Sequence, residues 1–487
     1  MAKFYLTTTL PYVNADPHLG FALEIVQADI IARFHKLLGE DIVFNTGTDE
    51  HGQKIYQKAL EARETPKAYA DKHAVNFEKL KKALNLSYTH FIRTTDPSHI
   101  EAAEAFWKRC DENGDIYKQI YKIKYCVGCE LEKTDSELTD GICPIHPNLK
   151  LEVIKEENYF FRFSKYQKPL LEYYEKNPKF VVPDFRFNEI KNFVKAGLAD
   201  FSISRLKEKM PWGIPVPDDE NQVMYVWFDA LINYISTLGW PKNDKNFEEF
   251  WGTINNPNAI QIAGKDNLRQ QSAMWQAMLM SAGLPNSKQI IIHGFITSNG
   301  QKMSKSLGNV INPFEIVEKY GTDALRYWLA TLSPFDDGDF TWDKFKEVYN
   351  ADLANGLGNL VSRVAKLCET SGFSYHVIPA RRFEEASPLG GQAGIQEQVK
   401  KELEKYRFDE AIKKIWENVT KANQSINETK PWTLQGEELK KSLRNLVLMI
   451  DLIASDLKPF LPETAEKIEE QFKGPKIVSK EPLFPRI

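Results

Sequence analysis

Two lysines in a short loop are the side chains in this sequence best suited to reaction chemistry. Lys302 and Lys305 lie in the pentapeptide KMSKS, with Gly300 before it and Gly308 after it. Two ammonium groups on a glycine-flanked loop suit a polyanion whose charge changes during reaction, such as a nucleoside triphosphate. Lysine pairs are also common in solvated turns, so this reading needs a second phosphate-binding element.

A second element of this kind lies near the N-terminus. His18 and Gly20 stand where a predicted loop, residues 11–17, meets a predicted helix. Free backbone N–H groups and the helix dipole favour an anion at such a junction. Gly20 would let a ligand approach the backbone closely, and His18 can donate a hydrogen bond to a phosphate oxygen.

The hydrophobic pattern around these residues predicts an α/β fold. Apolar residues recur with a helical period over residues 19–38, after a strand-like segment at residues 3–10. Further strand signals lie at residues 41–47, 224–229, 260–263 and 289–293. Alternating strands and helices indicate a parallel sheet with its ligand beyond the carboxyl ends of the strands. The GxGxxG fingerprint is absent, which disfavours a nicotinamide enzyme.

Three cysteines and a histidine predict a metal site in a segment that interrupts this pattern. An alternating aromatic stretch at residues 117–125 leads into Cys126-x2-Cys129, and Cys143-x2-His146 follows after 13 intervening residues. Two such knuckles can give three thiolates and one imidazole to a tetrahedral Zn²⁺ ion. Four protein ligands leave no open position, so we expect one structural zinc.

The C-terminal third predicts a helical bundle. Residues 343–472 are almost wholly helical in period, apart from a predicted loop at residues 371–396. The last residues, 474–487, are predicted to form a loosely held tail. Cys110 and Cys368 stand alone and are expected to be buried.

Bulk composition describes an ordinary globular protein. With 487 residues the chain is expected to form about three domains. Its net charge of −4 does not indicate nucleic-acid binding, although a local basic face would be enough for such binding. No apolar stretch is long enough to span a membrane, and no signal or transit peptide is evident. We therefore expect a cytoplasmic protein.

Taken together, these motifs resemble a known family. The segment Asn14-Ala-Asp-Pro-His18-Leu-Gly20 and the KMSKS loop resemble the HIGH and KMSKS signatures of class I aminoacyl-tRNA synthetases. The finer resemblance is to the methionyl-tRNA synthetases of bacterial type with a single zinc knuckle. It extends over nearly the whole chain, with supporting stretches at residues 9–14, 47–52, 225–230, 264–266, 359–363 and 430–432.

The resemblance implies a domain order. We expect a Rossmann-type catalytic domain in two halves, residues 1–112 and 216–290. Residues 113–215 would form a connective insertion with the zinc knuckle at 126–146. Residues 291–350 would hold the KMSKS loop and a stem-contact region. An all-α anticodon-binding domain would follow at residues 351–487.

The implied activity is a two-step reaction. L-methionine attacks the α-phosphate of ATP, giving methionyl-adenylate and pyrophosphate, and a terminal ribose hydroxyl of tRNA(Met) then takes the methionyl group. This would support translation initiation and elongation, with Mg²⁺ accompanying the ATP. No appended dimerisation domain is apparent, so a monomer is expected.

The same resemblance assigns site residues. Catalytic roles fall on His18, Lys302 and Lys305, with His18 near the α-phosphate and the lysines on the departing pyrophosphate. ATP would be bound by Asn14, His18, Gly20, Asp266, His293, Gly294, Ile296, Lys302 and Lys305, with Asp266 at the ribose and the backbone at 293–296 near adenine. Methionine would be bound by Leu10, Tyr12, Asp49, Trp227, Ala230, Leu231, Tyr234, Asn267 and Gln271, with Asp49 on the α-ammonium group. The anticodon would be read by Asn359, Arg363 and Trp432.

Some of these assignments depend on the resemblance alone. On pattern alone, residues 225–229 read as a core strand and Trp432 could be a core tryptophan. Three positions also depart from the family. Phe21 replaces the second histidine of the HIGH motif and cannot donate a hydrogen bond. Asn267 stands at a position that is usually apolar, and Gln271 stands where a histidine usually lies near the substrate sulfur. A glutamine amide can still donate weakly to sulfur.

Two other classes of function stay open. One is another class I synthetase, for leucine, isoleucine, valine or cysteine; the first three usually carry a large editing insertion, and the last uses its zinc in catalysis. The other is a synthetase-derived tRNA-binding protein with weak or no aminoacylation, which Phe21 favours and the triphosphate constellation disfavours.

Overall fold

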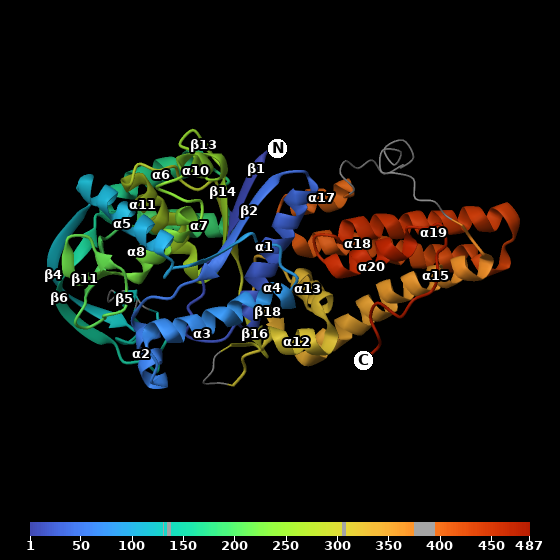
Figure 1. Ribbon diagram of the computed structural model, residues 1–487, viewed down its shortest axis with the longest axis horizontal. Coiled ribbons are helices and arrows are strands. Elements are labelled where there is room, and N and C mark those ends of the chain that lie inside the picture. Colours follow the sequence, from blue (N-terminus) through green and yellow to red (C-terminus); the bar gives the residue numbers. More distant parts are fainter. Residues whose placement is uncertain (130, 134–137, 304–307, 375–394) are drawn as a thin grey trace.

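Six parallel strands form the centre of the computed structural model, which describes residues 1–129, 131–133, 138–303, 308–374 and 395–487 (Figure 1). The order across the sheet is β3 (His90–Arg93), β2 (Asp41–Thr48), β1 (Lys3–Thr7), β14 (Ala259–Gly264), β15 (Gln289–His293) and β7 (Val181–Val182). Every neighbouring pair is parallel. The α/β fold predicted from the sequence is confirmed.

Side chains of the sheet alternate between two hydrophobic layers, as the pleat requires. Leu6 of β1 faces the layer that holds α1 (Leu19–Leu37). Its neighbour Tyr5 faces the opposite layer, with α5 (Pro97–Glu112) and α11 (Trp275–Ser281). Both faces of the sheet are therefore covered by helices, which is typical of parallel sheets.

The strand order reverses between β1 and β14. From β1 the chain proceeds to β2 and β3 on one side, whereas β14 and β15 extend the sheet on the other. The loops that follow β1 and β14 therefore diverge around a crevice at the carboxyl edge, which is where parallel sheets bind ligands. The edge strand β7 comes from within residues 113–215, so that segment also contributes to the central sheet.

Antiparallel strands build the insertion. One sheet has the order β5 (Leu131–Lys133), β4 (Ile116–Cys126), β6 (Glu152–Phe161) and β8 (Phe201–Ser202). A second has the order β10 (Pro215–Val216), β11 (Asp219–Met224) and β9 (Ser204–Leu206), so it extends beyond residue 215 into the next segment of the chain. The strand predicted at residues 224–229 is wrong beyond Met224, because α8 (Val226–Ala230) begins there. The short apolar run fitted a buried helix as well as a strand, an ambiguity that periodicity cannot resolve.

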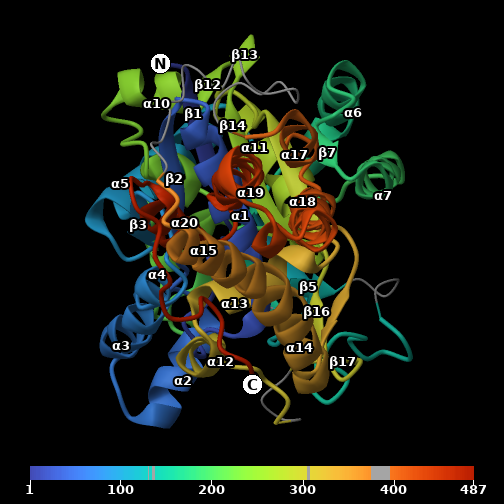
Figure 2. The same ribbon diagram turned by 90° about the vertical axis from the view of Figure 1, so that its right-hand side faces the viewer.

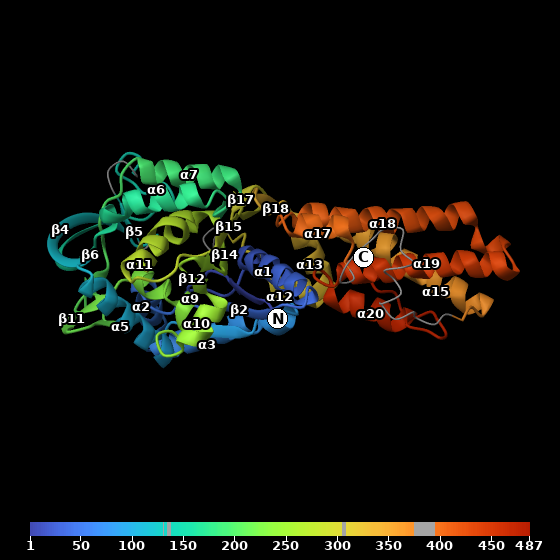
Figure 3. The same cartoon turned by 90° about the horizontal axis from the view of Figure 1, so that it is seen from above.

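A bundle of helices extends to one side of the sheet domain (Figures 1 and 3). Its members include α15 (Asn359–Ser371), α17 (Glu397–Leu403), α18 (Phe408–Thr429), α19 (Gly436–Leu457) and α20 (Pro462–Phe472), most of which Figure 2 shows nearly end-on. The predicted bundle is confirmed, although most of the predicted loop at 371–396 lies outside the described residues. Among the described helices, none is long and apolar enough to cross a membrane.

The C-terminal tail is packed rather than loosely held, so that prediction is wrong. Ile477 and Phe484 are buried, and the Phe484 ring meets Tyr349 edge-on. Asn350 donates through Nδ2 to the carbonyl oxygen of Ile487 at 3.0 Å. These two apolar residues are widely spaced and show no period, so the sequence carries no local signal for this packing. Cys110 and Cys368 are buried, as predicted.

A buried ion pair joins the sheet domain to the bundle. Asp29 on α1 lies 2.8 Å from Arg326 Nη1 on α13 (Thr322–Thr331), and neither side chain is exposed to solvent. Arg326 also donates to three carbonyl oxygens, those of Leu84, Pro459 and Phe460. Burial raises and Arg326 lowers the pKa of Asp29, and its arginine partners prevail, so the carboxylate stays ionised. One guanidinium group thus fastens the α1 layer to the chain that enters α20.

Replacing Arg326 by methionine is expected to be strongly destabilising. The substitution leaves Asp29 buried next to an apolar side chain and removes the donor for the three carbonyl groups, which should cost about 3–5 kcal/mol. The midpoint of urea unfolding should fall accordingly. Lys319→Met, which breaks an exposed ion pair with Glu315, serves as the control and should leave the unfolding midpoint almost unchanged, because solvent screens exposed pairs. Equal midpoints for the two variants would contradict the central role of Arg326.

Candidate functional site

The first site residue caps the helix that follows β1. His18 has an extended backbone, and its Nδ1 atom accepts a hydrogen bond from the Gly20 N–H at 3.0 Å. Since Nδ1 accepts, the ring proton lies on Nε2, which can donate outward. A side chain at Gly20 would begin 2.9 Å from His18 Cε1, so the glycine makes room for this ring rather than for a ligand alone. Desolvation, and then the charge of Lys302, lower the pKa of His18 and favour its neutral form.

The loop with the lysine pair approaches this helix start. Lys302 is exposed in β17 (Gln301–Lys302), which pairs with β16 (Ile296–Ser298). After desolvation, the positive charge of its ammonium group is the next cause that lowers the pKa values of His18 and His146. The Met303 methyl group lies 3.9 Å from where a Gly20 side chain would begin. Lys305, predicted as the second lysine of the clamp, lies outside the described residues.

A buried carboxylate that sequence reasoning missed orders the two sides of the crevice. Glu24 on α1 accepts hydrogen bonds from the Thr9 N–H at 2.8 Å and the Thr9 hydroxyl at 2.6 Å. Its other oxygen lies 2.9 Å from His293 Nε2 at the end of β15. Burial lowers and the pairing with Glu24 raises the pKa of His293, and the pairing prevails. The only sequence signal was an acidic residue within the apolar run of α1.

The remaining ATP candidates lie around the same edge of the sheet. Asp266 follows β14. Desolvation raises the pKa of its carboxyl group, and the charge of His293 offsets this only in part. Gly294 is held against the backbone, since a side chain there would begin 2.0 Å from the Asp336 carbonyl oxygen. Ile296 is buried at the start of β16. Asn14 is oriented with its amide oxygen 3.3 Å from Lys54 Nζ.

Three candidates for amino-acid binding meet on the other side of the crevice. Tyr12 pairs with Asp49 through a parallel bridge just beyond β1 and β2. The rings of Tyr12 and Trp227 lie edge to face, with centroids 6.5 Å apart. Asp49 is almost fully buried. A carboxylate thus lies near two aromatic rings, which suits a ligand with a cationic group and an apolar tail.

A second group of candidates forms a buried polar network. Gln271 Nε2 donates to the Tyr234 hydroxyl at 2.7 Å, and Gln271 Oε1 accepts from Gln261 at 3.1 Å. One amide hydrogen of Gln271 is therefore already used within the protein. Asn267 donates weakly to Asp266 at 3.4 Å, which places it toward the ATP candidates. Ala230 and Leu231 are buried, and Leu10 is half-buried.

Two histidines clamp a buried aspartate beside the amino-acid candidates, an arrangement that sequence reasoning also missed. Asp229 lies 2.7 Å from His51 Nδ1 and 2.7 Å from His99 Nε2. Burial raises and the two imidazoles lower the pKa of Asp229, and the imidazoles prevail. His51 is two residues beyond Asp49, and Asp229 is two residues beyond Trp227. The network therefore fixes the loop after β2 against α8.

The four predicted metal ligands come together. The ligand atoms of Cys126, Cys129, Cys143 and His146 all lie within 4.8 Å of one another. Cys129 Sγ is 3.2 Å from His146 Nδ1 and 3.5 Å from Cys143 Sγ. A side chain at Gly128 would begin 2.6 Å from the His146 ring, so the turn requires glycine. Three thiols and one imidazole at this spacing fit a four-coordinate metal ion.

The candidates for RNA recognition lie in the bundle. Asn359 and Arg363 are on α15, and Arg363 donates to Asn427 Oδ1 at 3.0 Å. Trp432 is 58% exposed in the turn between α18 and α19, so it is not a core tryptophan. This turn lies at the far end of the bundle from the sheet (Figure 1).

Family models cover most of the chain. The model described as tRNA synthetases class I (M) matches residues 4–152 and 137–365. The model described as the anticodon-binding domain of tRNA ligase matches residues 393–487. With the doubly wound sheet and the bundle, these matches define a class I tRNA synthetase.

Individual relatives define the family more closely. Methionine–tRNA ligase of Thermotoga maritima is 42% identical over 99% of this chain and 77% of its own length. The enzyme of Clostridium acetobutylicum is 41% identical over 100% of this chain and 78% of its own length. A solved Mycobacterium tuberculosis methionyl-tRNA synthetase in complex with methionyl-adenylate aligns with a TM-score of 0.90, at 33% identity and full coverage of both chains. The chain belongs to the methionine–tRNA ligase family.

Removing one thiol from the knuckle should abolish metal binding. Cys129→Ser replaces a thiolate by a hydroxyl that binds metal poorly, so we expect about one metal ion per chain to fall to nearly none. Inductively coupled plasma mass spectrometry of the purified protein measures this. Cys368→Ala, a buried cysteine in the bundle, is the control and should retain the metal. Equal metal content in both variants would show that the four residues do not form the site.

Proposed function

We infer that this chain activates L-methionine with ATP and transfers the methionyl group to tRNA(Met), supplying translation initiation and elongation. The observation that carries this proposal is the meeting of three elements at one sheet edge, in a chain of this family. His18 caps α1, Lys302 approaches it from β17, and Asp49 lies beside the Tyr12 and Trp227 rings.

In the first step, a methionine carboxylate oxygen attacks the α-phosphorus of ATP, and the bond to the pyrophosphate oxygen breaks. His18 would donate through Nε2 to the α-phosphate, while Lys302 and Lys305 would bind the departing pyrophosphate. No covalent enzyme intermediate is required, so positioning and charge stabilisation supply the rate. Mg²⁺ bound with ATP would offset phosphate charge.

Binding roles follow from the same geometry. Asp49 would pair with the α-ammonium group of methionine, and the Tyr12 and Trp227 rings would contact its thioether. Asp266 would accept hydrogen bonds from the ATP ribose. The contact between Glu24 and His293 would keep the binding residues in position, because it joins α1 to the end of β15.

The accessory parts have matching roles. We assign Zn²⁺ to the knuckle at residues 126–146, as a structural ion with four protein ligands. The exposed Trp432 ring, with Asn359 and Arg363, would contact unstacked anticodon bases. The division into residues 1–112, 113–215, 216–290, 291–350 and 351–487 stays a prediction, as do the monomeric state and the cytoplasmic location.

A synthetase-derived RNA-binding protein without activity is the competing candidate. Phe21 favours it, since the side chain offers no hydrogen bond to a phosphate. Its ring instead packs edge-on against Phe77 of α3 (Pro66–Glu78), at 5.4 Å between centroids. The approach of Lys302 to the His18 cap of α1 supports a triphosphate site, which a pure RNA-binding protein would not need.

Amino-acid-dependent exchange of pyrophosphate into ATP tests the activity. We expect exchange with methionine, and weaker exchange with norleucine and homocysteine. Gln271 has one amide hydrogen committed to Tyr234, so its discrimination for sulfur should be modest, within about tenfold between methionine and norleucine. No methionine-dependent exchange would overturn the proposed activity, and faster exchange with another amino acid would overturn the specificity.

Phe21→His should raise the rate of adenylate formation. The new imidazole restores a donor near the phosphates, and one such donor is commonly worth about 10²–10³ in rate. Rapid-quench measurement of methionyl-adenylate in a single turnover gives the rate directly. Phe21→Leu keeps an apolar contact with Phe77 without adding a donor and should not accelerate the step. A Phe21→His rate no higher than wild type would show that another group already supplies the missing hydrogen bond.

A further inference from the structure

A very short hairpin leads into the lysine loop. β16 and β17 pair at two positions, one of which joins Thr297 to Lys302. Asn299 and Gly300 form the turn between them, with φ angles of 52° and 73°. Positive φ at both central residues is what a type I′ hairpin turn requires. Because a two-stranded hairpin is marginally stable on its own in water, contacts from outside the hairpin must fix its geometry.

A carboxylate on the neighbouring strand makes two such contacts. β18 (Gly338–Phe340) runs parallel to β16 (Figure 1). Asp339 Oδ1 accepts hydrogen bonds from the Gly300 N–H at 2.7 Å and from the Thr297 hydroxyl at 2.7 Å. These two donors, first Gly300 and then Thr297, lower the pKa of Asp339, so the group is ionised at neutral pH. One oxygen atom therefore fixes both the turn and the residue that pairs with Lys302.

A second carboxylate fixes the residue just before the hairpin. Asp337 accepts a hydrogen bond from the Phe295 N–H at 2.9 Å and lies 2.6 Å from Lys265 Nζ. The Nζ atoms of Lys265 and Lys302 lie 4.6 Å and 5.7 Å from the centre of the Phe295 ring. Asp337 thus fixes the chain before β16, while Asp339 fixes the turn after it.

The strand that carries Asp339 is itself part of the hydrophobic core. Phe340, the next residue, is buried, and its ring lies edge-on to Trp328 of α13 with centroids 5.0 Å apart. The same core includes residues of α1 and of the bundle. The position of the lysine hairpin is therefore set by a rigid element and not by the loop alone.

We propose that Asp339 is a positioning residue for adenylate formation. It acts through Gly300 and Thr297 on the backbone of Lys302, and it keeps that ammonium group where pyrophosphate departs. This role rests on the proposed function and adds to it a residue that would touch neither substrate. Without Asp339 the hairpin would hold Lys302 in a wider range of positions. Ordering of the lysine would then have to accompany each reaction, at a cost in rate.

Rapid-quench measurement of methionyl-adenylate in a single turnover tests this role. Asp339→Ala should slow the step about 10- to 100-fold, because a displacement of about 1 Å can cost about 100-fold in rate. The dissociation constant of methionine should stay unchanged, because the methionine candidates lie on the other side of the crevice. Asp339→Asn keeps an acceptor oxygen and should recover most of the rate. An Asp339→Ala rate equal to wild type would overturn the proposal.

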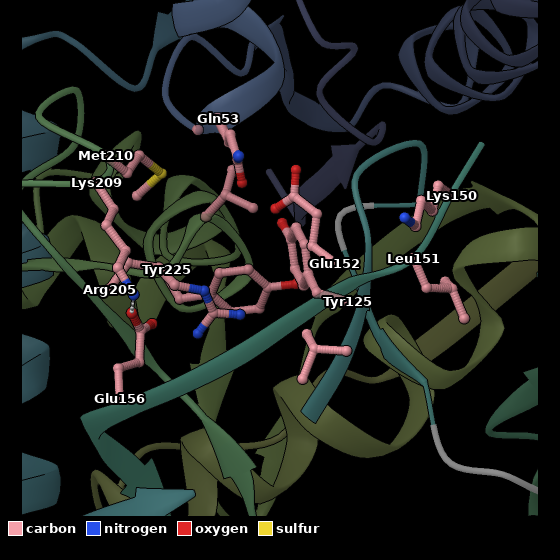
Figure 4. Close-up of a pocket in the computed structure, with 13 residues that line it drawn as sticks. Gln53, Tyr125, Lys150, Leu151, Glu152, Glu156, Arg205, Lys209, Met210 and Tyr225 are labelled. Atoms are coloured by element: carbon pink, nitrogen blue, oxygen red, sulfur yellow. Dashed lines mark hydrogen bonds and ion pairs between the residues drawn. The ribbon is translucent and has the colours of Figure 1, made fainter. Parts of the chain in front are cut away.

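Two further variants separate the hairpin contact from a general loss of charge. Thr297→Val removes only the hydroxyl donor to Asp339 and should give an intermediate loss of rate. Glu152→Ala is the matched control, since it removes an exposed carboxylate from β6. Glu152 lines a cavity of about 600 Å³ whose described lining residues include none from β16, β17 or β18 (Figure 4). The control should react at the wild-type rate, and a loss as large as that of Asp339→Ala would overturn the proposal.

A double-mutant cycle shows whether Asp339 acts through the lysine. When Asp339→Ala is added to Lys302→Ala, we expect a further loss of no more than about threefold, because residues that act through one another are not additive. Losses that multiply in full would overturn the positioning role. If the wild type shows no methionine-dependent exchange, the proposed function itself fails. If the wild type is active and the losses multiply, only the role of Asp339 fails.

Discussion

The ion pair between Asp29 and Arg326 is the constraint on which the arrangement of the whole chain depends. Two charges without solvent contact are stable only when each is fully compensated. Asp29 is compensated by Arg326, by Arg33 and by the backbone and hydroxyl of Ser87. Arg326 in turn donates hydrogen bonds to carbonyl groups of two distant segments. The pair forms only when the α1 layer, α13 and the entry to α20 are all in place, so it selects one docking of the bundle.

The other half of α1 carries a second buried pair, between Glu24 and His293, which orders the crevice. Through these two pairs, the single helix α1 contacts both the crevice and the segments that lead into the bundle. The Asp229 network acts similarly across the crevice, since it joins the loop after β2 to α8 and α5. Apolar burial brings these layers together, but it is non-directional. The charged and hydrogen-bonded residues determine how the layers are oriented.

Local signals predicted much of this structure. The helix at α1, the strands β1, β2, β14 and β15, the knuckle and the bundle each depend on a pattern within a short window. The strand predicted at residues 225–229 was wrong because a five-residue apolar run suits either a strand or a helix. Glu24, His51 and His99 were missed because their roles depend on partners more than 100 residues away. The roles of individual site residues came from the family resemblance, not from spacing.

One hydrophobic core runs without interruption from the α1 face of the sheet through α13 into the bundle. The exposed ring of Trp432 and the crevice at the sheet edge therefore keep a fixed separation, which is set when the chain folds and not when RNA arrives. An RNA that touches both must match that span with its own rigid geometry. If Trp432 contacts an RNA loop as proposed, an RNA of the wrong length or shape would be rejected even when its loop sequence is correct, because contact at one end would place the other end out of reach.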